Sequence, residues 1–350
     1  MNILDSKIYN SDLIRIIQSL QHLYFPQKKT FFITGATGLI CSPVVDVLYA
    51  LNKLKKLEWK IIAAVRNPEN AANRFGKYCD DKNFEIFRYD ASKSACFPNG
   101  IDYIVHGAGN AYPKAIAAEP VETLRNSIIG LFEILEYARN NKSRVLYVSS
   151  SEVYGQLNNT EPIKEEEFGY IEILNPRSSY SIGKCAAETL CASFLNEYSV
   201  DSVIVRPGHI YGSTASKFDN RVSSAFMYSA SMGQNLVLKS SGKQIRSYCY
   251  CLDCASAIIT ALLNGKAGEA YNISNRNSIC SISEMADIFA KSGNVKCIFD
   301  IPKNDEKKAF NPMLNSSLNS EKLESLGWNP VFTKQEGFEH SIEICKEMMK

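Results

Sequence analysis

A strand, a turn and a helix follow one another in Thr30-Phe31-Phe32-Ile33-Thr34-Gly35-Ala36-Thr37-Gly38-Leu39-Ile40-Cys41. The apolar run at 30–34 is rich in β-branched and aromatic residues, which predicts a strand. A strand that enters a glycine-rich turn and then a helix is the geometry that cradles a dinucleotide pyrophosphate. Gly35 permits the tight turn and Gly38 lets the backbone approach phosphate, while the free N–H groups of the next helix face the anion. A turn that binds no ligand is the alternative.

The third glycine of this pattern is replaced by Cys41. A side chain therefore stands where the helix and the strand pack closely. We expect either a reduced affinity for the cofactor or a helix that lies slightly farther out.

Further along the chain, apolar β-rich runs alternate with helical patterns, at 60–65, 84–89, 102–106, 144–149 and 202–206. This alternation predicts an α/β fold, a Rossmann-like doubly wound parallel sheet, with 268–273 as a candidate last strand. We expect a helical extension at 1–29, a dinucleotide-binding domain at 30–206, and at 207–350 a smaller, mainly substrate-binding subdomain interleaved with the sheet. Within the extension, a helical period runs from Asp12 to Tyr24 with Ser11 as the expected N-cap.

Composition narrows the partners and the compartment. The net charge is +2 with acidic and basic residues interspersed, so nucleic acid is not an expected partner. Residues 1–5 lack the features of a signal peptide and no apolar run is long enough to span a bilayer, which predicts a cytoplasmic protein without membrane attachment. The 11 cysteines are scattered, and Cys251-Leu252-Asp253-Cys254 has no second ligand pair at a matching spacing. We therefore expect reduced thiols, small buried side chains and no metal.

The chemistry is concentrated in two stretches, Ser149-Ser150-Ser151-Glu152-Val153-Tyr154 and Tyr180-Ser181-Ile182-Gly183-Lys184. Tyr180 and Lys184 are four residues apart, so on a helix they share one face. An ammonium beside a phenol stabilises phenolate and should lower the pKa of Tyr180 toward neutrality. Tyr180 would then serve as a general base, which predicts oxidation or reduction of a carbinol carbon.

The end of the second predicted strand bears on the choice of dinucleotide. It runs Val65-Arg66-Asn67, without the carboxylate that takes the ribose hydroxyls of NAD. Arg66 at this edge favours NADP over NAD, although the guanidinium could instead stack on adenine or point to solvent.

Taken together, these patterns resemble the extended short-chain dehydrogenase/reductases of the NAD-dependent epimerase/dehydratase family, which modify nucleotide-linked sugars. The resemblance extends from Thr30 to about Val331, with Cys41 and the missing carboxylate as departures. Its anchors are the stretches at 34–40, 106–109, 126–130, 149–155, 180–184, 206–212 and 242–248.

The resemblance implies roles for individual residues. Tyr180 would transfer the proton, Lys184 would bind the nicotinamide ribose, and Ser150 would bond the reacting sugar oxygen during hydride transfer, usually at C4. Arg246 and Arg177, with Ser151, would contact the nucleotide sugar, since a guanidinium matches phosphate oxygens. The residues implied in binding NAD or NADP are Gly35, Thr37, Gly38, Leu39, Ile40, Arg66, Asp90, Ala91, Gly107, Ala108, Gly109, Asn126, Ser149, Tyr180, Lys184, Pro207 and His209.

Glu152 bears on the outcome of the reaction. A carboxylate there would remove the C5 proton, which becomes acidic once C4 is a ketone. Ser151-Glu152 is more similar to UDP-glucuronate decarboxylases or GDP-mannose dehydratases than to dTDP-glucose dehydratases, which have Asp before the Glu. A surface or supporting carboxylate is the alternative.

Three functions stay open at this point. The first is an enzyme that oxidises and re-reduces a nucleotide-diphosphate sugar within one turnover, giving epimerisation, dehydration or decarboxylation. The second is a net NADPH-dependent reductase of a 4-keto nucleotide sugar. The third is a catalytically silent nucleotide-sugar or dinucleotide sensor, for which Cys41 leaves room. The resemblance also implies a homodimer formed through helices near 121–140 and 179–198.

Overall fold

The central sheet is parallel, and the computed structural model describes it within residues 2–109, 111–301 and 313–350. In these ranges seven strands are paired in the order β10-β6-β5-β4-β1-β2-β3. Their bounds are β1 (Thr30–Thr34), β2 (Lys60–Val65), β3 (Phe84–Arg88), β4 (Tyr103–His106), β5 (Arg144–Val148), β6 (Ser202–Pro207) and β10 (Ala270–Ile273). The strand order reverses between β1 and β4, where a doubly wound sheet binds its ligand. The predicted fold class is confirmed, including the strand expected at 268–273.

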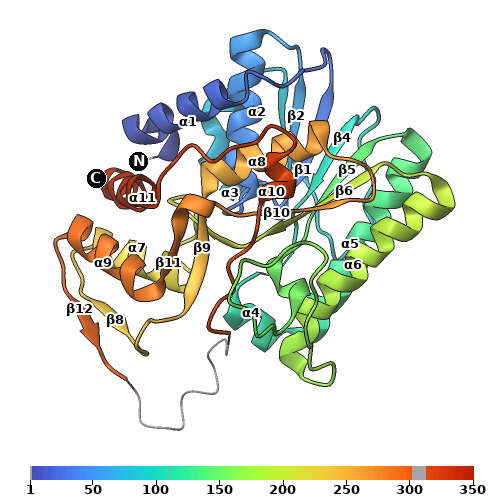
Figure 1. Ribbon diagram of the computed structural model, residues 1–350. Coiled ribbons are helices and arrows are strands. Elements are labelled where there is room, and N and C mark those ends of the chain that lie inside the picture. Colours follow the sequence, from blue (N-terminus) through green and yellow to red (C-terminus); the bar gives the residue numbers. More distant parts are fainter. Residues whose placement is uncertain (1, 110, 302–312) are drawn as a thin grey trace.

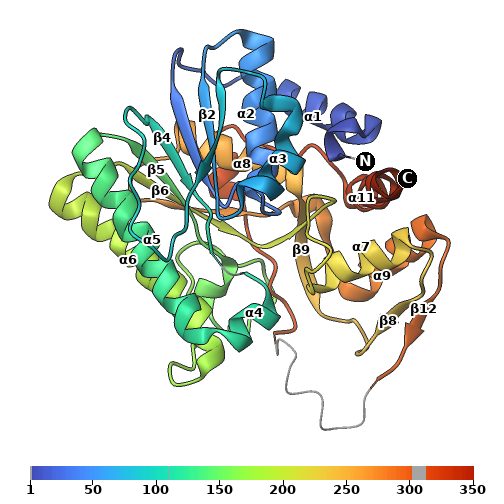
Figure 2. The same cartoon turned by 180° about the vertical axis from the view of Figure 1, so that it is seen from behind.

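Helices cover both faces of this sheet because successive strand residues point to opposite sides. Phe31 and Ile33 pack into one apolar cluster with α2 (Cys41–Lys55) and α8 (Cys251–Asn264). Phe32, between them, belongs to a second cluster with α5 (Pro120–Asn141) and α6 (Ser179–Tyr198). Figures 1 and 2 show α5 and α6 side by side along that second face.

The later part of the chain builds smaller sheets beside the carboxyl ends of the main strands (Figure 1). One has the order β11-β9-β7, from β7 (His209–Tyr211), β9 (Ile245–Tyr250) and β11 (Ile279–Ser281). The other pairs β8 (Leu236–Leu238) with β12 (Cys297–Phe299). The remaining α-helices are α3 (Pro68–Phe75), α4 (Pro113–Ala118), α7 (Val222–Ser231), α9 (Ile282–Gly293), α10 (Glu321–Glu324) and α11 (Lys334–Met349). The short 3-10 helices are η1 (Ile3–Asp5), η2 (Gly76–Tyr78), η3 (Ser151–Tyr154), η4 (Pro176–Ser178) and η5 (Arg276–Ser278). The predicted substrate-binding role of 207–350 stays a prediction.

The helix expected in the N-terminal extension is present, but its predicted start at Asp12 is wrong. Helix α1 spans Lys7–Ser19, and its N-cap is Ser6, whose hydroxyl accepts from the Tyr9 backbone N–H at 3.1 Å. Both Ser6 and Ser11 are acceptable caps, and tertiary contacts select the earlier one. Tyr9, in the first turn, is fully buried and donates its hydroxyl hydrogen bond to Asp46 of α2 at 2.5 Å.

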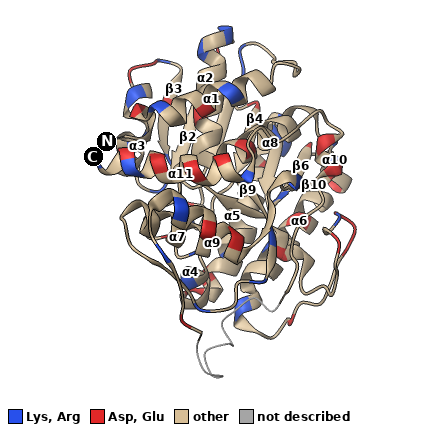
Figure 3. Cartoon of the chain, turned by 60° about the vertical axis from the view of Figure 1, so that its left-hand side comes forward, with Lys and Arg blue, Asp and Glu red and all other residues tan. Residues whose placement is uncertain are grey.

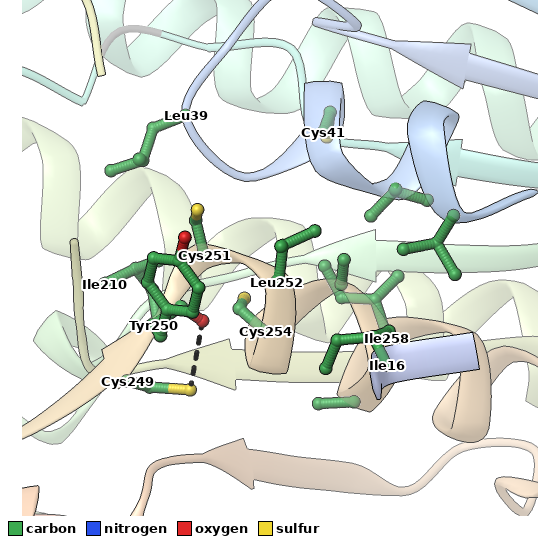
Figure 4. Close-up of a cluster of buried hydrophobic side chains, with 14 of the residues drawn as sticks. Ile16, Leu39, Cys41, Ile210, Cys249, Tyr250, Cys251, Leu252, Cys254 and Ile258 are labelled. Carbon is green, nitrogen blue, oxygen red and sulfur yellow. Dashed lines mark hydrogen bonds between the residues drawn. The ribbon is translucent and has the colours of Figure 1, made fainter. Parts of the chain in front are cut away.

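Four of the cysteines lie together in the core around α2 and α8. Figure 4 shows Cys249, Cys251 and Cys254 packed among Leu252, Ile210 and other apolar side chains, with Cys41 facing them from α2. All four are free thiols with no more than 2% of their surface exposed, and burial raises the pKa of Cys251 to about 12. The expectation of small buried thiols is confirmed at this cluster.

Surface charge is mixed, as Figure 3 shows for Lys and Arg alongside Asp and Glu. Among the described residues, no helix combines the length and the apolar character needed to cross a bilayer.

Candidate functional site

The turn after β1 is shaped by close backbone approach. Gly35 has φ +64°, and a Cβ there would lie 2.8 Å from the carbonyl oxygen of Gly107, which follows β4. Thr34 ties the two strand ends together, because its Oγ1 accepts from the N–H groups of Gly107 at 3.2 Å and Ala108 at 3.1 Å. The turn therefore leaves an open backbone cradle, which fits the pyrophosphate of a dinucleotide.

Cys41 fits at the start of α2 because the residue that it faces, directly after β4, is a glycine. Its side chain is 2% exposed at the first residue of α2. A Cβ added to Gly107 would lie closer to the Cys41 sulfur than the 3.0 Å limit of real structures. The thiol thus occupies the space that a side chain at position 107 would fill. Helix α2 can therefore stay close to the strands although Cys41 replaces the usual glycine.

A cavity of about 650 Å³ lies over the cradle. Of the residues predicted to bind the dinucleotide, those of the two strand-end turns line it, namely Gly35, Thr37, Gly38, Gly107, Ala108 and Gly109. The same cavity is also lined by Arg66, Asp90, Ala91 and Asn126. Leu39 and Ile40 lie at the start of α2, where the Leu39 carbonyl accepts a hydrogen bond from Thr214 at 2.9 Å.

One end of the cavity is lined by Arg66 and Asp90, which follow β2 and β3. Asp90 accepts hydrogen bonds from the backbone N–H of Ser92 at 3.0 Å and from its hydroxyl at 2.8 Å. These bonds, and more weakly the charges of Lys93 and Arg66, lower the pKa of Asp90. Asp90 is therefore an ionised carboxylate near Arg66 at neutral pH.

The predicted catalytic residues meet at the carboxyl end of β5. Tyr180 is 9% exposed in the first turn of α6, and Lys184 is 8% exposed one turn later. The Lys184 Nζ lies 5.8 Å from the centroid of the Tyr180 ring and donates to the carbonyl of Val148 at 2.7 Å. Ser150 caps η3 after β5 and hydrogen-bonds to Tyr180.

The pKa of Tyr180 in the protein alone differs from the predicted one. Burial, followed by the charge of Glu152, raises its pKa to about 12, against the lowering effects of Ser150, Arg221 and Arg177. Burial also lowers the pKa of Lys184 to about 8, although Glu188 and Cys41 act in the opposite direction. The predicted shift of Tyr180 toward neutrality is therefore wrong for the protein alone, because desolvation of the phenolate outweighs the lowering effects of Ser150, Arg221 and Arg177.

Glu152 and Arg177, predicted for separate roles, form a bidentate ion pair. Arg177, from η4, donates to the two carboxylate oxygens of Glu152 at 3.1 and 2.9 Å. Ser181 adds a hydrogen bond to Glu152 at 3.1 Å. Since Glu152 also raises the pKa of Tyr180, its charge acts directly on the phenol. Ser151, the first residue of η3, is half-buried beside it.

Arg246 is a buried cation that does not belong to the lining of this cavity. It lies in β9, is 5% exposed, and donates to the carbonyls of Ile245 at 2.7 Å and Met313 at 3.2 Å. Within the described ranges no ion pair involves Arg246, and burial lowers its pKa. His209 is half-buried, and desolvation, reinforced by the charges of Arg246 and Arg221, lowers its pKa to about 3. The imidazole of His209 is therefore neutral at physiological pH, and Pro207, the last residue of β6, is buried.

A buried ion pair beneath the catalytic residues was not anticipated from the sequence. Glu188, one turn after Lys184, accepts from the Ser149 hydroxyl at 2.6 Å and from Arg206 at 2.7 to 3.2 Å. Arg206 also donates to the Tyr154 hydroxyl at 3.0 Å. The position of Glu188 at four residues past Lys184 was the available signal, because it places both on one helix face.

Arg221 is a second functional candidate that sequence patterns did not mark. Its guanidinium is fixed by the buried Asp219 at 2.5 to 3.0 Å, and Ser224 supports the same carboxylate at 3.0 Å. The charge of Arg221 lowers the pKa values of both Tyr180 and His209, so it lies close to the catalytic residues. Its loop has no helical or strand period from which this position follows.

Comparison with known proteins adds three findings. The model of the NAD dependent epimerase/dehydratase family matches residues 31–274. Among curated proteins, UDP-glucuronic acid decarboxylase 1 of Xenopus tropicalis is 26% identical over 92% of this chain and 73% of its own. Human dTDP-D-glucose 4,6-dehydratase is 25% identical over 91% of this chain and 90% of its own.

Solved structures support the same fold. DesIV, a dTDP-glucose 4,6-dehydratase of Streptomyces venezuelae with NAD bound, superposes with a TM-score of 0.78 at 22% identity, over 91% of this chain and 97% of its own. UDP-glucuronic acid 4-epimerase of Bacillus cereus, in complex with UDP-glucuronic acid and NAD, gives 0.76 at 19% identity, over 91% of this chain and 99% of its own.

Proposed function

Because the chain belongs to the NAD-dependent epimerase/dehydratase family, we propose that it is an enzyme that oxidises C4 of a nucleotide-diphosphate sugar and reduces the product again within one turnover. The observation that carries this proposal is the meeting of Ser150, Tyr180 and Lys184 at the carboxyl end of β5. In the sheet β5 pairs with β4, and the turn after β4 lines the cavity with Gly107, Ala108 and Gly109. The carboxylate of Glu152 stands next to them, which favours dehydration or decarboxylation over simple epimerisation at C4.

Oxidation at C4 requires a proton acceptor for the sugar hydroxyl. NAD or NADP, which Gly35, Gly38 and Lys184 would hold, would supply the hydride acceptor for C4 and a positive charge that favours phenolate at Tyr180. The phenolate of Tyr180 takes the proton of the C4 hydroxyl as the C4–H bond breaks. Ser150, which hydrogen-bonds to Tyr180, holds the same sugar oxygen, and Lys184 contributes positive charge below the pair.

The ketone at C4 makes the C5 proton acidic, and Glu152 is placed to receive that proton. Arg177 and Ser181 donate to the carboxylate oxygens, so they hold Glu152 in a fixed orientation. Glu152 would then act through a remaining lone pair, or after Arg177 turns toward an anionic group of the substrate. Arg177 is accordingly both a positioning residue for Glu152 and a candidate substrate contact.

Arg246 and Arg221 provide positive charge for the diphosphate of the substrate. Arg246 is buried and bonded only to carbonyls among its described partners, so an anion would supply the charge it lacks. Arg221 is already neutralised by Asp219, which suits it to hydrogen bonding rather than to charge capture. We assign the diphosphate to Arg246.

A net reductase is the second candidate, and it rests on the end of β2. Arg66 lines the cavity there, next to Asn67, where a carboxylate would hold the ribose of NAD. This arrangement favours NADP, which is the cofactor that cells use for net reductions. A reductase would convert a 4-keto nucleotide sugar and consume one NADPH in each turnover.

A panel assay separates these reactions. The protein is incubated with UDP-, GDP-, CDP- and dTDP-sugars, with and without NADPH, and products are analysed by mass spectrometry and NMR. Loss of water or of carbon dioxide supports the proposal, and unchanged mass with altered stereochemistry indicates epimerisation. A gain of two hydrogens that depends on NADPH indicates the reductase. No conversion of any sugar would leave the sensor as the remaining account.

Two substitutions test the assigned roles. Tyr180→Phe should lower turnover by about 100-fold or more because the proton acceptor is lost. Tyr198→Phe, on the same helix but partly exposed, is the control and should keep wild-type turnover. For Glu152→Gln we expect loss of dehydration with survival of C4 epimerisation. The opposite pattern would contradict its role at C5.

We also propose a homodimer formed through α5 and α6. The two helices pack against each other, and the outer surface of α5 exposes Val121, Ile129 and Phe132 at 70%, 42% and 47%. A second copy of the same helix pair would cover this surface with a closed twofold interface. Phe132→Glu should convert the protein to a monomer in light scattering, and a wild-type monomer would refute the assignment.

A further inference from the structure

The cavity over the β1 turn is lined in part by both ends of the described chain. Asn2 and Ile3 line it from one side and Met348, in the last turn of α11, from another. Figures 1 and 2 show the two ends next to each other, on the side of the molecule where α1, α3 and α11 lie. All three residues lie outside the matched range 31–274, so the family match does not account for this wall.

The N-terminal segment is attached to the helix that follows β2. Asn2 Nδ2 donates to the carbonyls of Asn73 and Arg74, in the last turn of α3, at 2.7 and 3.1 Å. Asp5 forms an ion pair with Lys77, which also donates to the Leu4 carbonyl at 3.2 Å. The segment Asn2–Asp5, which we call the clasp, is therefore bonded at both of its ends.

The clasp has a defined internal shape. Asn2 Oδ1 accepts from the Leu4 N–H at 3.0 Å, and the Asn2 N–H donates to Asp5 Oδ2 at 3.1 Å, which completes a capping box around η1. Ile3 is 2% exposed although it lines the cavity, so its side chain is packed in place as part of the wall. Such a pre-formed wall needs little ordering when a ligand binds.

The clasp faces the adenosine half of a bound dinucleotide. In a doubly wound sheet the adenosine ribose lies at the end of β2 and the nicotinamide at the far side of the turn. Arg66, Asn67 and Asn70 line the cavity at the β2 end, together with the clasp. Tyr180 and Lys184 belong to the other end, on α6.

We propose that the clasp encloses the adenosine half of the dinucleotide and must leave α3 before the cofactor is released. This inference rests on the proposed function, since an enzyme that oxidises and re-reduces one sugar needs the same cofactor molecule for both steps. Contacts between the clasp and the bound adenosine half stabilise the complex and so slow dissociation, which retains the cofactor through the turnover.

The test opens the clasp by Asn2→Asp with Asp5→Lys. The new carboxylate faces the carbonyls of Asn73 and Arg74, and the new ammonium faces Lys77. Dissociation of NADH or NADPH is followed by stopped-flow fluorescence, and affinities for ADP-ribose, nicotinamide mononucleotide and UDP by calorimetry. We expect release about tenfold faster and ADP-ribose bound about tenfold more weakly, while nicotinamide mononucleotide and UDP are unchanged.

Arg15→Ala is the matched control. It removes the α1 ion pair to Glu336 of α11 at 3.2 Å, on a part of α1 that does not line the cavity, so it should leave release unchanged. If the double variant does not fold, Asn2→Ala is measured in the same way. This substitution removes the side-chain hydrogen bonds of Asn2 and keeps the ion pair between Asp5 and Lys77. Wild-type release rates in a folded clasp variant would overturn the inference.

The experiment also distinguishes the two proposals. A wild-type protein that releases the dinucleotide slowly but converts no nucleotide sugar would contradict the proposed function and leave the clasp to be judged by its release rate. A wild-type protein that binds no dinucleotide would overturn both.

Discussion

Replacing Gly107 by Ala should destabilise the protein through its contact with Cys41 alone. The new Cβ would lie under 3.0 Å from the Cys41 sulfur, whereas its next neighbours, the Thr34 carbonyl and Val148 Cγ2, would be at 3.5 and 3.6 Å. Those two distances are ordinary van der Waals contacts. Overpacking of this kind costs about 1–3 kcal/mol because the helix or the strand must shift.

The free-energy cost of Gly107→Ala depends on the Cys41 sulfur, so the same substitution in a protein without that sulfur is the control. In a Cys41→Ala background the sulfur is gone, and Gly107→Ala gains a buried methyl and restricts the unfolded chain by about 0.4–1 kcal/mol. We therefore expect Gly107→Ala to cost about 2 kcal/mol in the wild type and to be neutral or stabilising beside Cys41→Ala. Their coupling energy should be about 2 kcal/mol or more.

Urea unfolding of the four proteins in this cycle measures the coupling, with the buried Trp59 and Trp328 as fluorescence reporters. ADP-ribose affinity provides a second reading, since displacement of α2 in Gly107→Ala should weaken binding and Cys41→Ala should restore it. An equal cost of Gly107→Ala in both backgrounds would show that the sulfur does not occupy this space.

Two further substitutions test buried charges. Glu188→Gln should lower the free energy of unfolding by about 3–5 kcal/mol, because Arg206 would remain buried without its partner charge. Urea unfolding measures this loss. Recovery of stability in the double variant Glu188→Leu with Arg206→Met would confirm the cause. Asp12 raises the pKa of His340 above its usual value of 6.5, so their stabilisation is full below that pH and is lost as pH rises through the folded pKa. The stability deficit of His340→Gln should accordingly be about 1 kcal/mol near pH 6 and vanish at alkaline pH, whereas a deficit independent of pH would refute this titration.

The sequence was sufficient for features that depend on neighbouring residues. The strand at 30–34, the turn at Gly35 and the helix after it follow from a local pattern, and so does the shared face of Tyr180 and Lys184. These elements are set by short-range geometry, so their positions could be predicted before any tertiary contact was known.

Features that depend on burial could not be predicted in this way. The phenol pKa of Tyr180 rises because the protein desolvates it, and no spacing of residues reports that environment. Arg177 and Glu152 are far apart in sequence, and their pairing follows from how η4 packs near η3. The accommodation of Cys41 likewise needs Gly107, on a different strand, to be placed opposite it.

Helix α1 has a consequence for how the chain is made. Its buried Asp12 accepts a hydrogen bond from Tyr250 at 3.1 Å and lies 3.0 Å from His340, a residue 328 positions later in the chain. These partners leave the ribosome long after α1 itself. Native contacts of such large sequence separation form late, because the loop they close must be ordered first. Helix α1 must therefore wait for α11, and a nascent chain that still lacks α11 would expose Asp12 and its apolar neighbours to chaperones and proteases.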